Sequence, residues 1–386
     1  MTVGLKPELA ARLVALRHDL HRRPELAFEE HETAARLEVE LGRLDPLSLE
    51  RVAGTGLVAR FAGRDRSRPP IIVRGDIDAL PIDEATGAAF SSEIPGRMHA
   101  CGHDVHASWT VGAAALLAAE PAACDVLVLL QPAEEVADGA AAVLATGVLD
   151  GAAAIFGAHV DLRFPLGKIV AQAGPLAASA DIFRLTLTAP GAHGARPHES
   201  ADPVVGAAAL VMALQTVVAR RIDPSAPAVL TVGELQAGAA HNVIPSRAHL
   251  AGTLRATDPK TRTTLVEEVE RIARGVAATH GLGVEVEIEI GPPPLVNDER
   301  AAAWATQAVV ESFGESALVP FGMTNLASED FAFYLERMPG CFLRIGSRPE
   351  GAPVVAAHSP RFLPADEAIG FGAVSLAQAA RVAARG

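Results

Sequence analysis

A thiol and several imidazoles lie close together around residue 100. His99, Cys101 and His103 alternate along the chain, so an extended backbone would place their side chains on one face. Asp104 is predicted to cap a helix over residues 105–120. A thiolate beside an imidazole suits a divalent transition metal, with zinc as the first choice. A buried structural cysteine is the competing interpretation of Cys101 taken alone, and His103 two residues later favours a metal site.

Acidic and imidazole residues also follow three predicted strands in the first half of the chain. They are Asp76 and Asp78 after strand 70–74, Glu134 and Glu135 after strand 125–130, and His159 after strand 153–157. Helices are predicted between these strands, which indicates a mostly parallel sheet with helices on both faces. Because open sheets of this kind place their sites at the carboxyl ends of the strands, we expect these side chains to meet at one edge.

The adjacent residues Glu134 and Glu135 point in different directions, so one carboxylate can bind a metal while the other remains a base toward water. A pair of surface charges is the usual interpretation of two such glutamates in isolation. Here the donors predicted to meet at the sheet edge are Cys101, His103, Glu135, His159 and His358. Five protein ligands exceed the three or four that one zinc ion takes, which predicts a two-metal site.

The sequence pattern changes near residue 179. Four segments there alternate apolar and polar residues, as in an antiparallel sheet with one exposed face: 182–188, 229–235, 247–254 and 284–290. Helices are predicted over 202–221 and 258–279. We therefore predict a smaller α+β domain, residues 179–288, with a four-stranded antiparallel sheet and two helices. It interrupts an α/β catalytic domain made of residues 1–178 and 289–386.

The composition, 49% hydrophobic and 20% charged, is that of a globular protein with a large core. The net charge of −13 and the lack of a basic cluster argue against nucleic acid and membrane surfaces as partners. Three scattered cysteines are too few for a disulfide framework and favour a reducing compartment. Neither a signal peptide nor an apolar run of about 18 residues is predicted, so we expect a cytoplasmic protein.

The chain resembles the amidohydrolase branch of the M20 metallopeptidases, which includes hippurate hydrolases, N-acetyl amino-acid deacetylases and indole-acetyl amino-acid hydrolases. The matching motifs follow the family's order: His21–Leu26, Arg74–Pro81, Met98–Asp104, Gln131–Glu135, His193 with Pro197 and His198, Asn242–Pro245, Gly252–Arg255, Ser328–Phe331 and His358–Pro360. Gly75 stands where alanine is usual and Ala192 where glycine is usual. Neither departure removes a functional group.

This resemblance implies two divalent metal ions per subunit, Zn²⁺ or Mn²⁺, with Co²⁺ or Ni²⁺ as alternatives. Cys101 would bridge them, and the terminal ligands would be His103, Glu135, His159 and His358. Glu134 would be the general base. Asp76 replaces a histidine ligand of more distant relatives, and it would orient the site together with Asp78. His99 and His106 are interpreted as neighbours of the ligands, and the N-terminal histidines, His21 among them, as surface or supporting residues.

The resemblance also assigns a role to the smaller domain, as a lid and a dimer surface. His193 would reach the site from the lid of the partner subunit and stabilise the oxyanion, so a homodimer or a tetramer is expected. Asn242 and Arg255 would hold the carboxylate of the substrate's amino-acid half.

The predicted function is therefore that of a binuclear amidohydrolase, which cleaves N-acetyl, N-benzoyl or aryl-acetyl amino acids to a carboxylic acid and a free amino acid. Two alternatives stay open. A hydrolase that uses Cys101 as its nucleophile needs no metal, so a chelator would not inhibit it. A non-catalytic metal-binding protein on a hydrolase scaffold has no need of an unliganded base such as Glu134.

Overall fold

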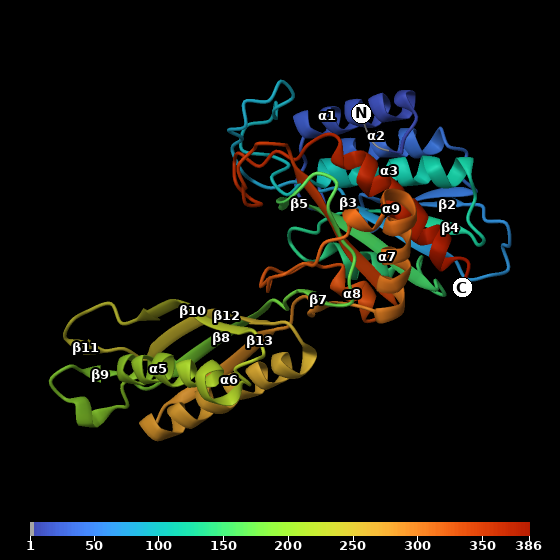
Figure 1. Cartoon of the computed structure of the whole chain (residues 1–386). Coiled ribbons are helices and arrows are strands. Elements are labelled where there is room, and N and C mark those ends of the chain that lie inside the picture. Colours follow the sequence, from blue (N-terminus) through green and yellow to red (C-terminus); the bar gives the residue numbers. More distant parts are fainter. Residues whose placement is uncertain (1–3) are drawn as a thin grey trace. The chain divides into compact units, whose positions relative to one another are not determined.

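The computed structural model describes residues 4–386 (Figure 1). The chain forms two compact units, each described by itself. The first unit contains the described residues up to Gly174, together with Asn297–Gly322 and Phe333–Gly386. The second unit contains Pro175–Val296 and Met323–Ala332. Each unit has its own hydrophobic core.

A seven-stranded sheet forms the centre of the first unit, in the order β1-β2-β4-β3-β5-β15-β6. The parallel strands are β3 (Ile71–Asp76), β4 (Val126–Gln131), β5 (Ala154–Pro165) and β15 (Gly340–Arg348). The antiparallel strands are β1 (Ser48–Val52), β2 (Gly56–Phe61) and β6 (Ile169–Val170). Every residue of β3 and β4 is buried, as expected for strands covered on both faces.

The helices of the first unit supply this cover. They are α1 (Pro7–Arg22), α2 (His31–Gly42), α3 (His103–Ala119), α4 (Gly139–Ala145), α7 (Glu299–Phe313) and α9 (Ala368–Ala383). Helix α3 packs against β3, α1 and α9 and is buried on almost all sides, with Trp109 fully enclosed. The short α8 (Ala332–Leu335) begins at the last residue of the second unit, directly before the chain returns to the first unit at Phe333.

The second unit is a four-stranded antiparallel sheet in the order β10-β12-β8-β13. Its strands are β8 (Asp181–Thr188), β10 (Ala228–Ala237), β12 (Arg247–Ala256) and β13 (Gly283–Glu289), and its helices are α5 (Pro203–Arg221) and α6 (Pro259–His280). Asp202 and Asp258 cap the two helices by accepting backbone hydrogen bonds. Burial alternates along β8 because the helices cover only one face of the sheet.

The short strands β9 (Ala192–His193) and β11 (Val243–Ile244) form a separate two-stranded sheet, and β7 (Gly174–Ala177) pairs with β14 (Leu295–Asn297) in another. Among the helices of the described chain, α5 alone is long and apolar enough to cross a membrane, although the sequence predicted no such segment. Its apolar side chains include Leu210, Leu214 and Val217, which are fully buried in the core of the second unit.

The predicted fold class is confirmed, with a mostly parallel sheet in one part and an antiparallel four-stranded sheet with two helices in the other. Two local predictions are wrong. Helix α3 begins at His103 and is preceded by Gly102 with φ +94°, so Asp104 lies in the first turn and caps nothing. Strand β5 is longer than predicted, and His159 therefore lies within it rather than after it.

Candidate metal centre

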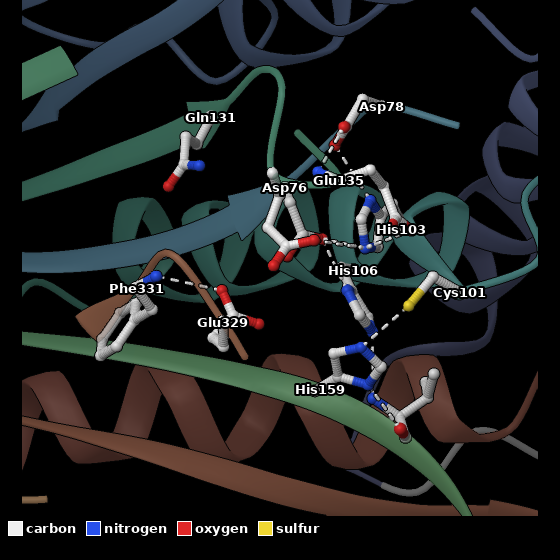
Figure 2. A network of polar contacts seen from close by, with 12 residues as sticks. Asp76, Asp78, Cys101, His103, His106, Gln131, Glu135, His159, Glu329 and Phe331 are labelled. Atoms are coloured by element: carbon white, nitrogen blue, oxygen red, sulfur yellow. Dashed lines mark hydrogen bonds and ion pairs between the residues drawn. The ribbon is translucent and has the colours of Figure 1, made fainter. Parts of the chain in front are cut away.

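Cys101 and His159 form one side of the candidate site (Figure 2). The Cys101 sulfur lies 3.2 Å from His159 Nε2, and both side chains are buried. His159 Nδ1 lies 2.6 Å from the carbonyl oxygen of Val160, which fixes the proton on Nδ1 and leaves the Nε2 lone pair facing the sulfur. Burial holds the pKa of His159 well below its usual range, so the ring is neutral, as a metal ligand must be.

His103 occupies the centre of the cluster. Its Nδ1 lies 3.1 Å from Asp78 Oδ1, whereas its Nε2 lies 3.8 Å from one oxygen each of Asp76, Glu134 and Glu135. Among residues 4–386, Nε2 has no hydrogen-bond partner. Burial lowers the pKa of His103, but the nearby acidic groups, Asp76 first, outweigh burial and raise this pKa well above its usual range. The surroundings of Nε2 therefore favour a positive charge.

The backbone of Glu135 is fixed by a hydrogen bond, whereas one oxygen of its carboxylate is available to a ligand. Its N–H donates to Asp78 Oδ2 at 2.9 Å, and its Oε2 lies 3.3 Å from His358 Nε2. Its Oε1 is buried and has no hydrogen-bond partner within the described chain. Burial raises the pKa of Glu135 to about 7, against the opposing effect of His103. A carboxylate oxygen left open in a buried site is a group that a bound cation can satisfy.

The sequence-predicted ligands come together in overlapping sets whose donor atoms lie within 4.8 Å of one another. The sets are Cys101 with His103 and His159, Cys101 with Glu135 and His358, and His103 with Glu134 and Glu135. Cys101 belongs to two of these sets. The shared thiol, the borderline and hard donors around it, and the open His103 Nε2 and Glu135 Oε1 fit a site for divalent metal ions.

Both ring nitrogens of His106 are occupied by hydrogen bonds, so His106 supports this site without acting as a ligand. Its Nδ1 donates to Asp76 Oδ1 at 2.6 Å, and its Nε2 accepts the N–H of Val160 at 3.0 Å. Arg74 contacts the other oxygen of Asp76, and burial opposes but does not prevent a low pKa of the Asp76 carboxyl. Asp76 thus orients His106 and lies near His103, whereas Asp78 contacts His103 directly (Figure 2).

Burial, followed by the charge of Glu135, raises the pKa of the Cys101 thiol well above its usual range. A cysteine nucleophile needs the opposite shift, and a bound cation would supply it by stabilising the thiolate as a ligand. Burial also lowers the pKa of His99 to about 4, and neither of its ring nitrogens has a hydrogen-bond partner among the described residues.

The candidate residues of the second unit lie in two separate places. His193 is exposed on β9, where it pairs with Val243, and the Asn242 carbonyl accepts the N–H of Gly194 at 2.8 Å. Arg255 lies at the far end of β12, half-buried, and burial lowers its pKa. Extended geometry gives about 26 Å between the two ends of β12 at Arg247 and Arg255, and Asn242 lies beyond the Arg247 end, next to the β9–β11 pair that follows β8. One chain therefore brings His193 and Asn242 together but not Arg255.

Sequence reasoning left His21 open between a surface and a supporting position, and it missed Glu30. His21 is fully buried, so it has the supporting position, and its Nδ1 lies 2.9 Å from Asp104 Oδ2. Glu30 is also fully buried and accepts the N–H of Ala133, the residue before Glu134. The early position of His21 in a family motif was a signal for it. No local pattern pointed to Glu30, because its partner lies far away in the sequence.

An α/β sheet whose edge carries a thiol, imidazoles and carboxylates with open donor atoms is typical of a metal-dependent hydrolase. The sequence matches the model of peptidase family M20/M25/M40 over residues 72–381. The chain belongs to this family, and it is a metal-dependent amidohydrolase.

Characterised relatives show the same relationship over almost the whole chain. N-acetyl-L-cysteine deacetylase of Bacillus subtilis is 38% identical over 345 residues, which cover 88% of this chain and 81% of that protein. The IAA-amino acid hydrolase ILR1-like 4 of Arabidopsis thaliana is 33% identical over 380 residues, with 97% and 86% covered. The crystal structure of a dinuclear metal binding peptidase of the M20 family from Bacillus subtilis has 34% identity and a TM-score of 0.86, with 98% and 99% covered.

Proposed function

We propose that this chain hydrolyses the amide bond of N-acyl amino acids at a centre of two divalent metal ions. The observation that carries the proposal is the position of Cys101 in two donor sets at once, with Glu134 beside them. The acyl group is acetyl, benzoyl or aryl-acetyl, and the products are a carboxylic acid and a free amino acid. The similarity to a deacetylase of N-acetyl-L-cysteine and to an IAA-amino acid hydrolase supports this substrate class.

The protein ligands in this proposal are Cys101 as the bridge and His103, Glu135, His159 and His358 as terminal ligands. When bound, the two ions lower the pKa of water and polarise the substrate carbonyl. The thiolate favours Zn²⁺, and Mn²⁺, Co²⁺ or Ni²⁺ are alternatives whose use depends on availability.

The residues of the chain itself divide the remaining work. Glu134 takes a proton from the attacking water and returns it to the departing amine, as a general base and then a general acid. Asp78 fixes the ring of His103 and the backbone of Glu135 through the contacts described above. His159 keeps its Nε2 lone pair directed into the site because the Val160 carbonyl holds the opposite proton.

We further propose that two copies of the chain complete each site. Asn242, which lies beside His193, is separated from Arg255 within one chain, so Asn242 and Arg255 cannot hold the same substrate carboxylate unless different subunits supply them. Arg255 suits a carboxylate because its guanidinium is planar and always charged. The resulting assembly is a homodimer or a tetramer. The free state of all three cysteines supports a cytoplasmic location.

A substrate panel tests the reaction. N-acetyl, N-benzoyl and indole-acetyl conjugates of several amino acids are assayed after loading with Zn²⁺, Mn²⁺, Co²⁺ or Ni²⁺. Glu134→Gln should keep its metal and lose turnover by about 10²-fold or more, whereas Glu135→Gln should lose metal. Turnover that persists in excess chelator would refute the metal mechanism. It would favour the alternative in which Cys101 is the nucleophile.

Subunit mixing tests the shared site. His193→Ala and Glu134→Gln are each expected to be inactive alone. When the two variants are unfolded together and refolded, mixed dimers should regain part of the activity, because one of their two sites has both residues intact. No regain in mixed dimers would show that each chain has a complete site.

A further inference from the structure

Glu30 lies outside the metal-binding residues, yet its side chain reaches the loop that carries Glu134. It directly precedes α2 and is fully buried. Its Oε1 accepts the N–H of Ala133 at 2.9 Å, and its Oε2 accepts the hydroxyl of Thr55 at 2.5 Å. Both oxygens are therefore occupied by the chain itself, and one of them holds the residue directly before Glu134.

Ala133 has a backbone conformation that needs such support. Its φ is +55°, in the left-handed region that is unfavourable for a residue with a Cβ atom. Its carbonyl oxygen accepts the N–H of Gly139 at 3.1 Å. A Cβ atom at Gly139 would lie 1.8 Å from the Pro132 oxygen, so this turn is tightly closed. Strained conformations of this kind persist only where surrounding contacts hold them.

The loop is held at a second point beyond Glu134. The N–H of Glu135 donates to Asp78 Oδ2 at 2.9 Å, and the N–H of Ala137 donates to the carbonyl of Glu134 at 2.8 Å. Glu30 and Asp78 thus fix the residues on either side of Glu134. With both neighbours fixed, the backbone of Glu134 has one direction in which to present its side chain.

We propose that Glu30 is a positioning residue for the reaction: it holds Ala133 in the left-handed conformation and thereby aims the carboxylate of Glu134. The inference rests on the proposed role of Glu134 as the general base. Because the acceptor function of Glu30 is what matters, an amide at this position should serve nearly as well. A side chain that cannot reach the N–H of Ala133 should not.

The test compares Glu30→Ala and Glu30→Gln with a matched control, Glu40→Ala. Glu40 is also a buried carboxylate, but it pairs with Arg12, Arg36 and Arg43. Glu30→Ala should lower kcat about tenfold or more, which corresponds to at least about 1.4 kcal/mol, with KM within about twofold and metal content unchanged. Glu30→Gln and Glu40→Ala should stay within about threefold of the unaltered enzyme. If Glu30→Ala fails to fold, Glu30→Asp, which is too short to reach Ala133, carries the same expectation.

Two further measurements separate positioning from a general loss of structure. In Glu30→Ala, the added change Ala133→Gly should recover part of kcat, because glycine adopts positive φ without a Cβ penalty. Hydrogen exchange in the metal-free protein should show faster exchange of the Ala133 amide in Glu30→Ala but not in Glu40→Ala. Unchanged kcat with a protected Ala133 amide would overturn the proposal, and so would a loss of kcat that Glu40→Ala matches or that follows loss of metal.

Glu134→Gln separates this inference from the proposed function. If Glu134→Gln keeps its turnover, the base assignment fails, and the positioning role fails with it. If Glu134→Gln is inactive while Glu30→Ala turns over normally, only the role of Glu30 is refuted.

Discussion

His21 carries a charge that depends on two buried carboxylates, and its removal should change how stability depends on pH. Its Nδ1 lies 2.9 Å from Asp104 Oδ2, and its Nε2 lies 3.3 Å from Glu84 Oε1. Burial alone would lower the pKa of His21, but the charge of Asp104 and the hydrogen bonds to both carboxylates raise it to about 9. The folded protein therefore keeps this proton well above neutral pH.

The direction of the effect follows from the unfolded chain, where a histidine loses its proton near pH 6.5. Since the pKa of His21 is about 9 in the folded protein, its contribution to stability is complete below about pH 6.5 and is lost as the pH rises to about 9. The difference between the two pKa values corresponds to at most about 3.4 kcal/mol. Arg17 also contacts Asp104 Oδ2, at 3.0 Å, so that carboxylate keeps a cation at high pH and the true loss is smaller.

Urea unfolding at pH 6, 7.5 and 9 in excess chelator measures this contribution without interference from metal release. Between pH 6 and 9, the free energy of unfolding should fall by about 2 kcal/mol more in the unaltered protein than in His21→Asn. His31→Asn, which changes an exposed histidine at the start of α2, should keep the full pH dependence. Equal pH dependence of His21→Asn and the unaltered protein, within about 0.5 kcal/mol, would refute the assigned charge.

Three further results are expected. Gly75→Ala should cost about 1–3 kcal/mol in urea unfolding, because a Cβ atom there would lie 2.3 Å from Thr110 Oγ1, and Thr110→Ala in the same chain should recover part of that loss. Chelation should lower the midpoint temperature of thermal unfolding, and added Zn²⁺ should restore it. At a free Zn²⁺ concentration of 100 times Kd, binding should stabilise the folded protein by about 2.7 kcal/mol. Asp78→Ala should weaken metal binding about 10- to 100-fold in a competition titration, since it orients His103.

The regular elements could be predicted because their signals are local. The fully buried strands β3 and β4, each beginning with a continuous apolar run, the alternating β8 and β13, and the helices between them follow from the pattern within each segment. The start of α3 could not be predicted in the same way. Asp104 is a favoured capping residue, but its Oδ2 is held by Arg17 and His21, residues of α1 far away in the sequence, and its side chain caps no backbone N–H of α3.

Gly75 shows the same limit at the level of packing. In the sequence it is a small departure from the family pattern, where alanine is usual. In the structure it lies against Thr110 of α3 and the backbone oxygen of His106, and a Cβ atom would approach them to 2.3 Å and 2.9 Å. Glycine is required at position 75 by its contact with α3, and the sequence of β3 alone could not have identified that contact.

The residues proposed as metal donors were easier to identify in the sequence than the residues that hold them, and chemistry explains the difference. Few residue types can bind a transition metal, so Cys101, His103, Glu135, His159 and His358 stand out in a sequence wherever strands end together. Holding an N–H or a ring nitrogen in place requires only a carboxylate or a carbonyl, which are common in any chain. Glu30 and the Val160 carbonyl do this work, and each is recognisable only from the group it contacts. Asp78 was expected to orient the site, but its contacts with His103 and with the N–H of Glu135 are seen only in the structure. The donor types therefore restrict the reaction that the site can perform, whereas in the proposed mechanism the residues that hold them set how accurately Glu134 and the ligands are aimed.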